Sequence, residues 1–176
     1  MTVSTGFGAG KSMSPIGWLG LPILASAVGT VILATPIQIF GFGLPQPIFA
    51  LAVAFAWALI RPSVLPPFAL LVMGLFLDVF WGGPQGLWPL CLLATYTVVL
   101  LVRRLILSQD FIVMWASYAA AIGVGIGLGY VLMTMESGTA PDAIAVGWMY
   151  YLPTLLLFPL AHRLIARYED ADVRFR

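Results

Sequence analysis

Residues 74–86 read GLFLDVFWGGPQG, and this stretch places an acidic residue inside an apolar segment. Glycines surround the acid at intervals of four residues, at Gly74, Gly82 and Gly86 around Asp78. Between residues 62 and 102 there is no other charged residue. Burying a carboxylate is costly unless it is hydrogen-bonded or paired. Asp78 is therefore the first candidate functional residue of the chain.

The composition of the 176-residue chain predicts an integral membrane protein. Hydrophobic residues make up 61% of it and charged residues 9%, whereas soluble domains carry about 25% charge. The first apolar run, from about Ile16, lacks a signal-peptide cleavage site near its end, so we expect it to be retained as a membrane span. The lone cysteine, Cys91, lies in an apolar run and is expected to pack as a small hydrophobic residue.

Breaks rich in glycine and proline divide the chain into six predicted transmembrane helices. The predicted fold is an all-α polytopic domain over residues 17–161, between a flexible N-terminal tail (1–16) and a polar C-terminal tail (162–176). The predicted spans are 17–40, 48–60, 66–81, 87–102, 111–135 and 143–161. The second is short, because crossing a bilayer takes about 20 helical residues. An even number of spans places both termini on one side.

The basic residues orient this arrangement. Glu136 and Asp142 are in the loops on the side away from the termini. All eight basic residues are in the segments on the side of the termini: Lys11, Arg61, Arg103, Arg104, Arg163, Arg167, Arg174 and Arg176. Basic residues concentrate on the cytoplasmic side of membrane proteins. Both termini are therefore predicted to be cytoplasmic, with Arg61, Arg103, Arg104, Arg163 and Arg167 as anchors there.

Three interpretations of Asp78 are open. The residue could belong to a proton or cation relay, because acids within a membrane are commonly functional. It could accept hydrogen bonds from the following turn or cap the next helix, since those amides need partners at membrane depth. It could also hold a polar group of a partner. No other Asp, Glu, Lys, Arg or His lies well inside a predicted span, so we favour the second interpretation, with partner binding as an addition.

Four glycines in the fifth predicted span, Gly123, Gly125, Gly127 and Gly129, predict close helix packing. Residues four apart share a helix face and residues two apart lie on nearly opposite faces. Small residues at such spacing let membrane helices approach one another closely. We expect this span to be contacted on two sides, by helices of the same chain or by a partner. Packing within the chain is favoured.

The remaining motifs carry no catalytic prediction. GFGAGKS at 6–12 resembles a phosphate-binding loop, but Thr5 stands where the first glycine is required and no strand precedes it. His162 has no second histidine with which to hold a metal. The chain contains no serine nucleophile elbow and no HExxH sequence. We therefore expect no enzyme activity, no cofactor, no metal and no nucleic-acid partner.

The glycine and aspartate pattern resembles that of the bacterial rod shape-determining protein MreD family. Further points of likeness are the Arg103-Arg104 pair that ends the following span, Trp115 just inside the next one, and the proline-bearing last span YYLPTLLLFPLAHRL before a short basic tail. The likeness covers nearly the whole chain in length, span number and topology. The family motif maps onto Gly74, Asp78, Gly82 and Gly86.

This resemblance implies a non-enzymatic scaffold in the bacterial inner membrane. Members of the family belong to the elongasome, which builds lateral peptidoglycan, and work with MreC, the MreB filament, RodA and penicillin-binding protein 2. Their fold is similar to the substrate-binding S components of energy-coupling-factor vitamin transporters. An S-component-like protein that binds a small molecule for uptake is therefore the alternative. It would need a pocket with several convergent polar groups on the outer side.

Overall fold

The computed structural model describes residues 15–34, 38–39, 42–43, 46–60, 64–106 and 110–173. Their regular secondary structure is helical apart from one short antiparallel pair, in which Gln38 pairs with Gly43 and Ile39 with Phe42. In chain order the elements are α1 (Pro15–Ala34), β1 (Gln38–Ile39), β2 (Phe42–Gly43), α2 (Phe49–Ile60), α3 (Leu65–Trp81), α4 (Leu87–Ile106), α5 (Phe111–Ser137), α6 (Ala143–Val146), the π-helix η1 (Gly147–Tyr151), α7 (Leu152–Leu155) and α8 (Phe158–Val173).

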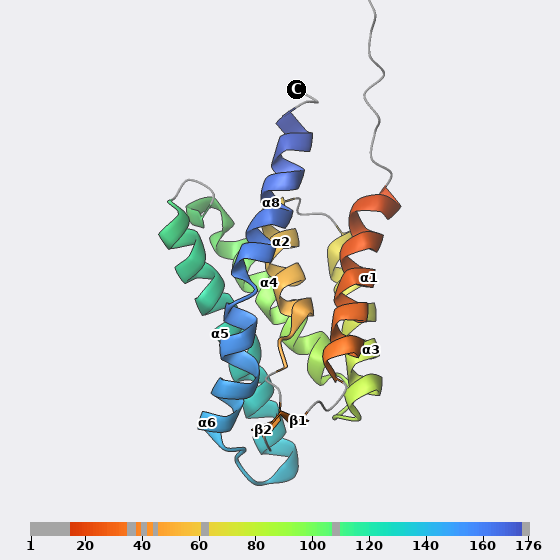
Figure 1. The fold of residues 1–176 in the computed structure, drawn as a ribbon, viewed down its shortest axis with the longest axis vertical. Helices are drawn as coiled ribbons and strands as arrows, with labels where there is room; N and C mark the ends of the chain where they lie inside the picture. The colour runs from red at the N-terminus through yellow and green to blue at the C-terminus, as the bar shows by residue number, and fades with distance from the viewer. Residues whose placement is uncertain are drawn as a thin grey trace, which may run out of the picture.

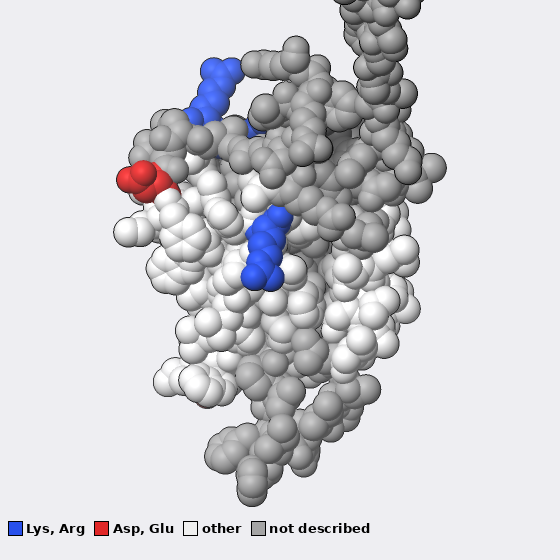
Figure 2. Space-filling model, turned by 45° about the horizontal axis from the view of Figure 1, so that its top comes forward, with Lys and Arg blue, Asp and Glu red and all other residues white. Residues whose placement is uncertain are grey.

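The helices run back and forth between two ends of the molecule (Figure 1). α1 begins and α8 ends at the same end, which we call the terminal end. The turn between α3 and α4 and the segment between α5 and α6 lie at the opposite end, which we call the hairpin end. Figure 2, with the terminal end turned forward, shows a few charged side chains among the described residues of this face. Most of the other described residues drawn there are uncharged.

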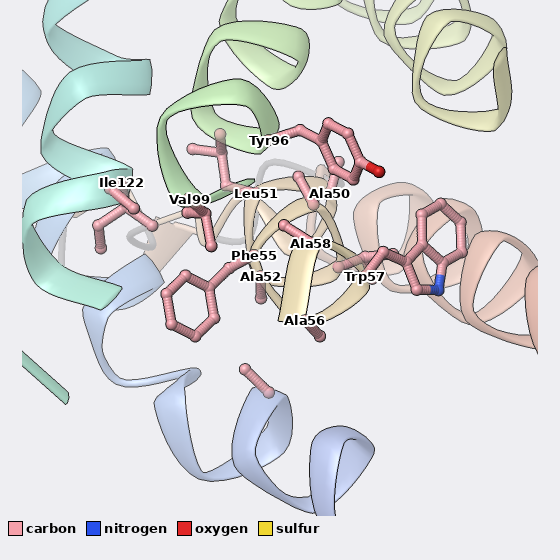
Figure 3. Packing of buried hydrophobic residues seen from close by; sticks show 14 of the residues in the cluster. Ala50, Leu51, Ala52, Phe55, Ala56, Trp57, Ala58, Tyr96, Val99 and Ile122 are labelled. Atoms are coloured by element: carbon pink, nitrogen blue, oxygen red, sulfur yellow. The ribbon is translucent and has the colours of Figure 1, made fainter. Parts of the chain in front are cut away.

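α2 forms the centre of the molecule. Every residue from Ala50 to Leu59 is buried, and α1, α3, α4, α5, α7 and α8 all contact this helix. A helix that is apolar on all faces belongs in a core. Its alternating alanines, small on every side, let the neighbouring backbones come close. Figure 3 shows Phe55 and Trp57 projecting from α2 toward the surrounding helices, among Tyr96, Val99 and Ile122.

The shortness of α2 is explained by this central position. Its 12 residues extend about 18 Å at 1.5 Å per residue, well below the ~30 Å of a bilayer's hydrocarbon core. Backbone groups at both ends have partners from other helices. The Ile48 N–H donates to Thr154 Oγ1 at 2.9 Å, and the Leu59 carbonyl accepts from Arg103 Nε at 3.1 Å. The surrounding protein thus supplies the partners that neither lipid nor α2 itself can provide.

Within the described residues, three stretches are long and apolar enough to cross a membrane: Leu87–Arg104, Phe111–Ser137 and Ala143–Ala166. Three shorter apolar helical stretches accompany them: Pro22–Ile32, Phe49–Ile60 and Leu65–Trp81. The first two long stretches agree closely with the predicted spans 87–102 and 111–135. The regular structure of the described residues is therefore almost wholly helical, and the length and composition of the helices are those of a membrane protein.

Two predicted boundaries differ from the structure. α1 ends at Ala34 rather than at residue 40, because Pro36 in the following segment lacks the N–H that a helix interior needs. The predicted polar tail from residue 162 is instead part of α8, which continues to Val173. The predicted N-terminal tail 1–16, with its glycine-rich GFGAGKS and Lys11, lies outside the described residues up to position 14.

The last predicted span, 143–161, is also divided. It comprises α6, η1, α7, a turn at residues 156–157 and the start of α8. Pro159 cannot donate to the carbonyl four residues earlier, so an α-helix cannot continue through this point. In the turn, Leu157 N–H donates to the Thr154 carbonyl, three residues back, at 3.1 Å. The chain therefore tightens locally before α8 begins.

Candidate functional site: the Asp78 hairpin

The family-like motif forms the tight connection between α3 and α4 at the hairpin end. α3 ends at Trp81, and Gly82 follows in the left-handed conformation with φ of 64°. Gly86, the last residue before α4, has φ of 94°. Side chains rarely adopt positive φ, so both positions favour glycine. Two of the three motif glycines are therefore required by the path of the backbone.

Asp78 holds this turn from the last turn of α3. Its side chain is buried, with 4% exposure. Oδ2 accepts a hydrogen bond from the Gly86 N–H at 2.7 Å, and Oδ1 accepts one from the Trp88 N–H at 3.0 Å. Both oxygens thus bind backbone amides at the start of α4, as the structural interpretation of this residue expects. A carboxylate is well placed there, because the N-terminus of a helix carries partial positive charge.

The first turn of α4 has its hydrogen-bonding needs met. Leu87 N–H donates to the Pro84 carbonyl at 3.3 Å, and Leu90 N–H to the Gly86 carbonyl at 3.2 Å. Trp88 N–H donates to Asp78. Pro89 has no N–H, and proline is tolerated in a first turn for that reason. Asp78 therefore completes a helix start that would otherwise leave buried amides without partners.

Gly74 allows α3 and α4 to touch through their backbones. A Cβ atom at this position would lie 2.5 Å from both Cα and N of Pro89. The space left by the missing side chain of Gly74 is thus filled by the first turn of α4. All four motif residues act on one hairpin: Gly74 through close approach, Asp78 through hydrogen bonds, and Gly82 and Gly86 through their φ angles.

The chemistry available to Asp78 is limited by these contacts. Backbone amides occupy one position on each oxygen. In the part of the chain that the structure describes, no group of three or more His, Cys, Asp or Glu residues could hold a metal ion. The nearby rings of Trp81 and Trp88 lie 4.6 Å apart, edge to face. The arrangement is suited to holding two helices together at a fixed angle.

A shallow hollow of about 310 Å³ lies between the hairpin and the end of α5. Its polar side chains are Gln85 and Glu136, and its walls are otherwise formed by Pro84, Gly86, Leu87, Leu90, Leu132 and Met135. Sites for polar small molecules combine an enclosing cavity with several convergent polar groups. Two polar side chains at an open hollow meet that description poorly.

The glycines of α5 are divided between packed and open positions. A Cβ at Gly125 would collide with Thr95 Oγ1 and lie 2.9 Å from Leu51 Cδ2, and one at Gly129 would lie 3.3 Å from the Cys91 sulfur. This face packs against α4 and α2 within the chain. A Cβ at Gly123 would lie 3.7 Å from a ring carbon of Tyr151, whereas one at Gly127 would have no neighbouring atom within 4 Å. The second predicted contact face is thus only partly occupied.

The predicted arginine anchors have different surroundings. Arg103 donates from Nε to the Leu59 carbonyl, so it caps the C-terminal end of α2 as well as ending α4. Arg104 and Arg163 are exposed at the terminal end. Arg61 lies outside the described residues, and for Arg167 the structure describes the backbone within α8 alone.

Sequence reasoning missed a second buried polar cluster, centred on Thr154. Thr154 is completely buried, and its Oγ1 accepts from the Ile48 N–H and donates to the Tyr150 carbonyl at 2.6 Å. The Tyr118 hydroxyl donates to the Thr154 carbonyl at 2.7 Å. These bonds join α5 and the start of α2 to the break in the last predicted span. A lone threonine between Pro153 and Pro159 was the available signal.

Comparison with protein-family models, with curated proteins and with solved structures gave no match. The functional interpretation therefore depends on the residues and contacts described above.

Proposed function

We propose that this chain is a non-enzymatic membrane scaffold of the MreD type. In this proposal all six helical passages lie in the bilayer, and the terminal end faces the cytoplasm. The back-and-forth course of the helices supports six passages (Figure 1), and the placement of the basic residues supports the orientation. The central position of α2 explains how a helix of 12 residues can form one of the passages.

The Asp78 hairpin is the observation that carries the proposal. Its four motif residues together make one rigid turn, and both carboxylate oxygens are engaged in it. A scaffold needs such a fixed surface, because association in lipid depends on close packing and a few hydrogen bonds. A transporter site would need polar groups free to bind a ligand. The contacts of Asp78 therefore favour assembly over ligand binding.

The proposed partners follow from the resemblance to the family. MreC would pack against this chain in the bilayer, and the hairpin end would face RodA and penicillin-binding protein 2 in the inner membrane. MreB would be reached at the terminal end, directly or through MreC. Arginines at that end would also contact anionic lipid, which attracts basic side chains.

Co-purification from the native cells tests this proposal. The tagged chain is solubilised mildly, and the recovered proteins are identified and quantified. MreC and penicillin-binding protein 2 are expected at near-stoichiometric levels, and Asp78→Ala should lower both and disturb cell shape. Asp110→Ala is the matched control, since the Asp110 side chain is exposed and makes no capping hydrogen bond.

Two results would contradict the scaffold. One is normal recovery of MreC together with normal rods in the Asp78→Ala strain. The other is recovery of an ATP-binding-cassette energising module without elongation proteins, which would favour the S-component-like alternative.

A further inference from the structure

An apolar groove of about 280 Å³ opens where α5 begins and the last span is broken. The buried ring of Phe158, with 1% exposure, belongs to its lining. Phe111, Ile112 and Trp115 line it from α5, and Leu156 and Pro159 from the turn and the start of α8. Because Pro159 interrupts the helix, α8 does not simply continue α7. The groove thus results from the break in the last predicted span, which hydrogen bonds of Thr154 and Tyr118 stabilise.

Two basic side chains, His162 and Arg163, lie where the groove approaches the terminal end. The ring of His162 packs 5.5 Å from Phe111 and 5.9 Å from Phe158, centre to centre. Arg163 is exposed and follows Pro159 by four residues, so the two share a face of α8 about 6 Å apart along the helix axis. The apolar groove therefore leads toward a charged end.

The start of α5 contributes partial positive charge to the same place. The first hydrogen bond of this helix runs from the Val113 N–H to the Asp110 carbonyl, at 3.0 Å, so the amides of Phe111 and Ile112 precede it. Such amides carry the positive end of the helix dipole. The exposed Asp110 carboxylate, next to Phe111 in the chain, opposes this field.

We infer that this groove binds one anionic phospholipid, with an acyl chain along the aromatic wall and the phosphate at His162 and Arg163. Two features select a lipid. The walls of the groove are apolar and open to the outside of the molecule, with Leu156 79% exposed. Its charged end is complementary to a phosphate, which attracts nearby basic side chains. The inference depends on the proposed membrane placement and not on the proposed protein partners.

Quenching of Trp115 by brominated lipid tests this inference. The purified full chain is placed in phosphatidylcholine vesicles that contain either brominated phosphatidylglycerol or brominated phosphatidylcholine at equal amounts. The fluorescence of Trp115 is obtained as the difference between the wild-type chain and Trp115→Phe. We expect brominated phosphatidylglycerol to quench this signal at lower concentration, and added salt to weaken the preference, because salt screens exposed charges.

Three variants sharpen the test. Arg163→Gln should lower the preference for brominated phosphatidylglycerol over brominated phosphatidylcholine about fivefold. This is the change in affinity expected when one basic side chain near an anionic surface is lost. Asp110→Asn should raise the preference, because it removes the opposing charge. Arg104→Gln removes the same charge from the same end but from α4, which lies against the other face of α5 that carries Val113 and Ser117. Arg104→Gln should therefore not change the preference for brominated phosphatidylglycerol measured at Trp115.

Either of two results would overturn the inference. Equal quenching by both brominated lipids in the wild-type chain would mean that Trp115 contacts general bilayer lipid alone. Protection of Trp115 from both lipids would mean that another protein segment, such as a second copy of this chain, covers the groove. Both readings need only the wild-type chain and Trp115→Phe, and neither depends on the folding of the charge variants. Neither result bears on recovery of MreC, so the two proposals fail independently.

Discussion

Asp78 acts as the cap of a helix to which it does not belong. Helix starts are usually capped by the residue immediately before them, but here the preceding residue is Gly86, which has no side chain. The carboxylate reaches across from α3 and binds the amides of Gly86 and Trp88. This explains why a charged residue is placed in an apolar segment. The two amides at the start of α4 satisfy the buried carboxyl group, and these hydrogen bonds join two helices at the same time.

Replacing Asp78 should therefore loosen the hairpin in graded steps. Asp78→Ala removes both acceptors and should lower the free energy of unfolding by about 2–4 kcal/mol, since buried amides lose their partners. Asp78→Asn keeps one side-chain oxygen, so its free energy of unfolding should lie between those of the wild-type chain and Asp78→Ala. The buried thiol of Cys91, with 1% exposure, is a natural reporter, because a thiol-reactive fluorophore labels it only on unfolding. The measurement is the labelling midpoint during heating in detergent.

The control for this series is Asp110→Ala, which removes a carboxylate without a capping hydrogen bond. Its midpoint should fall less than that of Asp78→Ala, because a carboxylate at a helix N-terminus without a hydrogen bond contributes only about 0.3–1 kcal/mol. Equal midpoints for the wild-type, Asn and Ala forms of position 78 would show that the carboxylate does not hold the hairpin.

Helix α5 has one glycine face that is used in packing and one that is partly open. Gly125 and Gly129 face Thr95 and Cys91 of α4, and Gly125 also faces Leu51 of α2. Gly127 has open space around it. The prediction of close packing within the chain thus holds for one face. At the open position, Gly127, contact with a partner helix stays a prediction.

Two glycine-to-alanine variants of α5 should behave in opposite ways. Gly125→Ala forces a methyl group against Thr95 and Leu51 and should cost about 1–3 kcal/mol through overpacking. Gly127→Ala meets no neighbour and should gain up to about 1 kcal/mol from higher helix propensity. The Cys91 labelling midpoints of the two variants measure the difference. A destabilised Gly127→Ala would contradict the open surroundings of that position.

The same two variants of α5 distinguish an effect on folding from an effect on assembly. If a partner helix covers the Gly127 face, Gly127→Ala should reduce co-purification of MreC while the midpoint stays unchanged or rises. Unchanged recovery would assign this face to lipid.

The molecule as a whole encloses a short apolar helix within longer ones. α2 is buried over its length, and its ends are tied to the last span by Thr154 and to α4 by Arg103. The outer helices carry the surface that faces the surroundings, where Val79, Leu101, Leu156 and other large apolar side chains are exposed. Such a surface is stable in lipid and would aggregate in water. The arrangement supports the membrane placement proposed above.

The proposed orientation can be measured at the two ends of α5. In a Cys91→Ala background, single cysteines are introduced by Ala140→Cys at the hairpin end and Asp110→Cys at the terminal end, both exposed positions. A membrane-impermeant thiol reagent applied to spheroplasts should label the first and spare the second. Labelling of the second should require permeabilised membranes. The reverse pattern would contradict the orientation, and labelling of both from outside would contradict a membrane-spanning α5.

Local rules were enough to predict the membrane class, most helix boundaries and the Asp78 turn from the sequence. Apolar length specifies a helix in lipid, and glycine and proline specify where it ends. The partners of Asp78 are also close in the chain, eight and ten residues away. Contacts between distant segments were not predictable in this way. The bond from Ile48 to Thr154 joins residues 106 positions apart, and the central position of α2, the packed face of α5 and the groove beside Phe158 all depend on which helices become neighbours. Side-chain packing over the whole molecule determines which helices become neighbours. No single stretch of sequence contains that information.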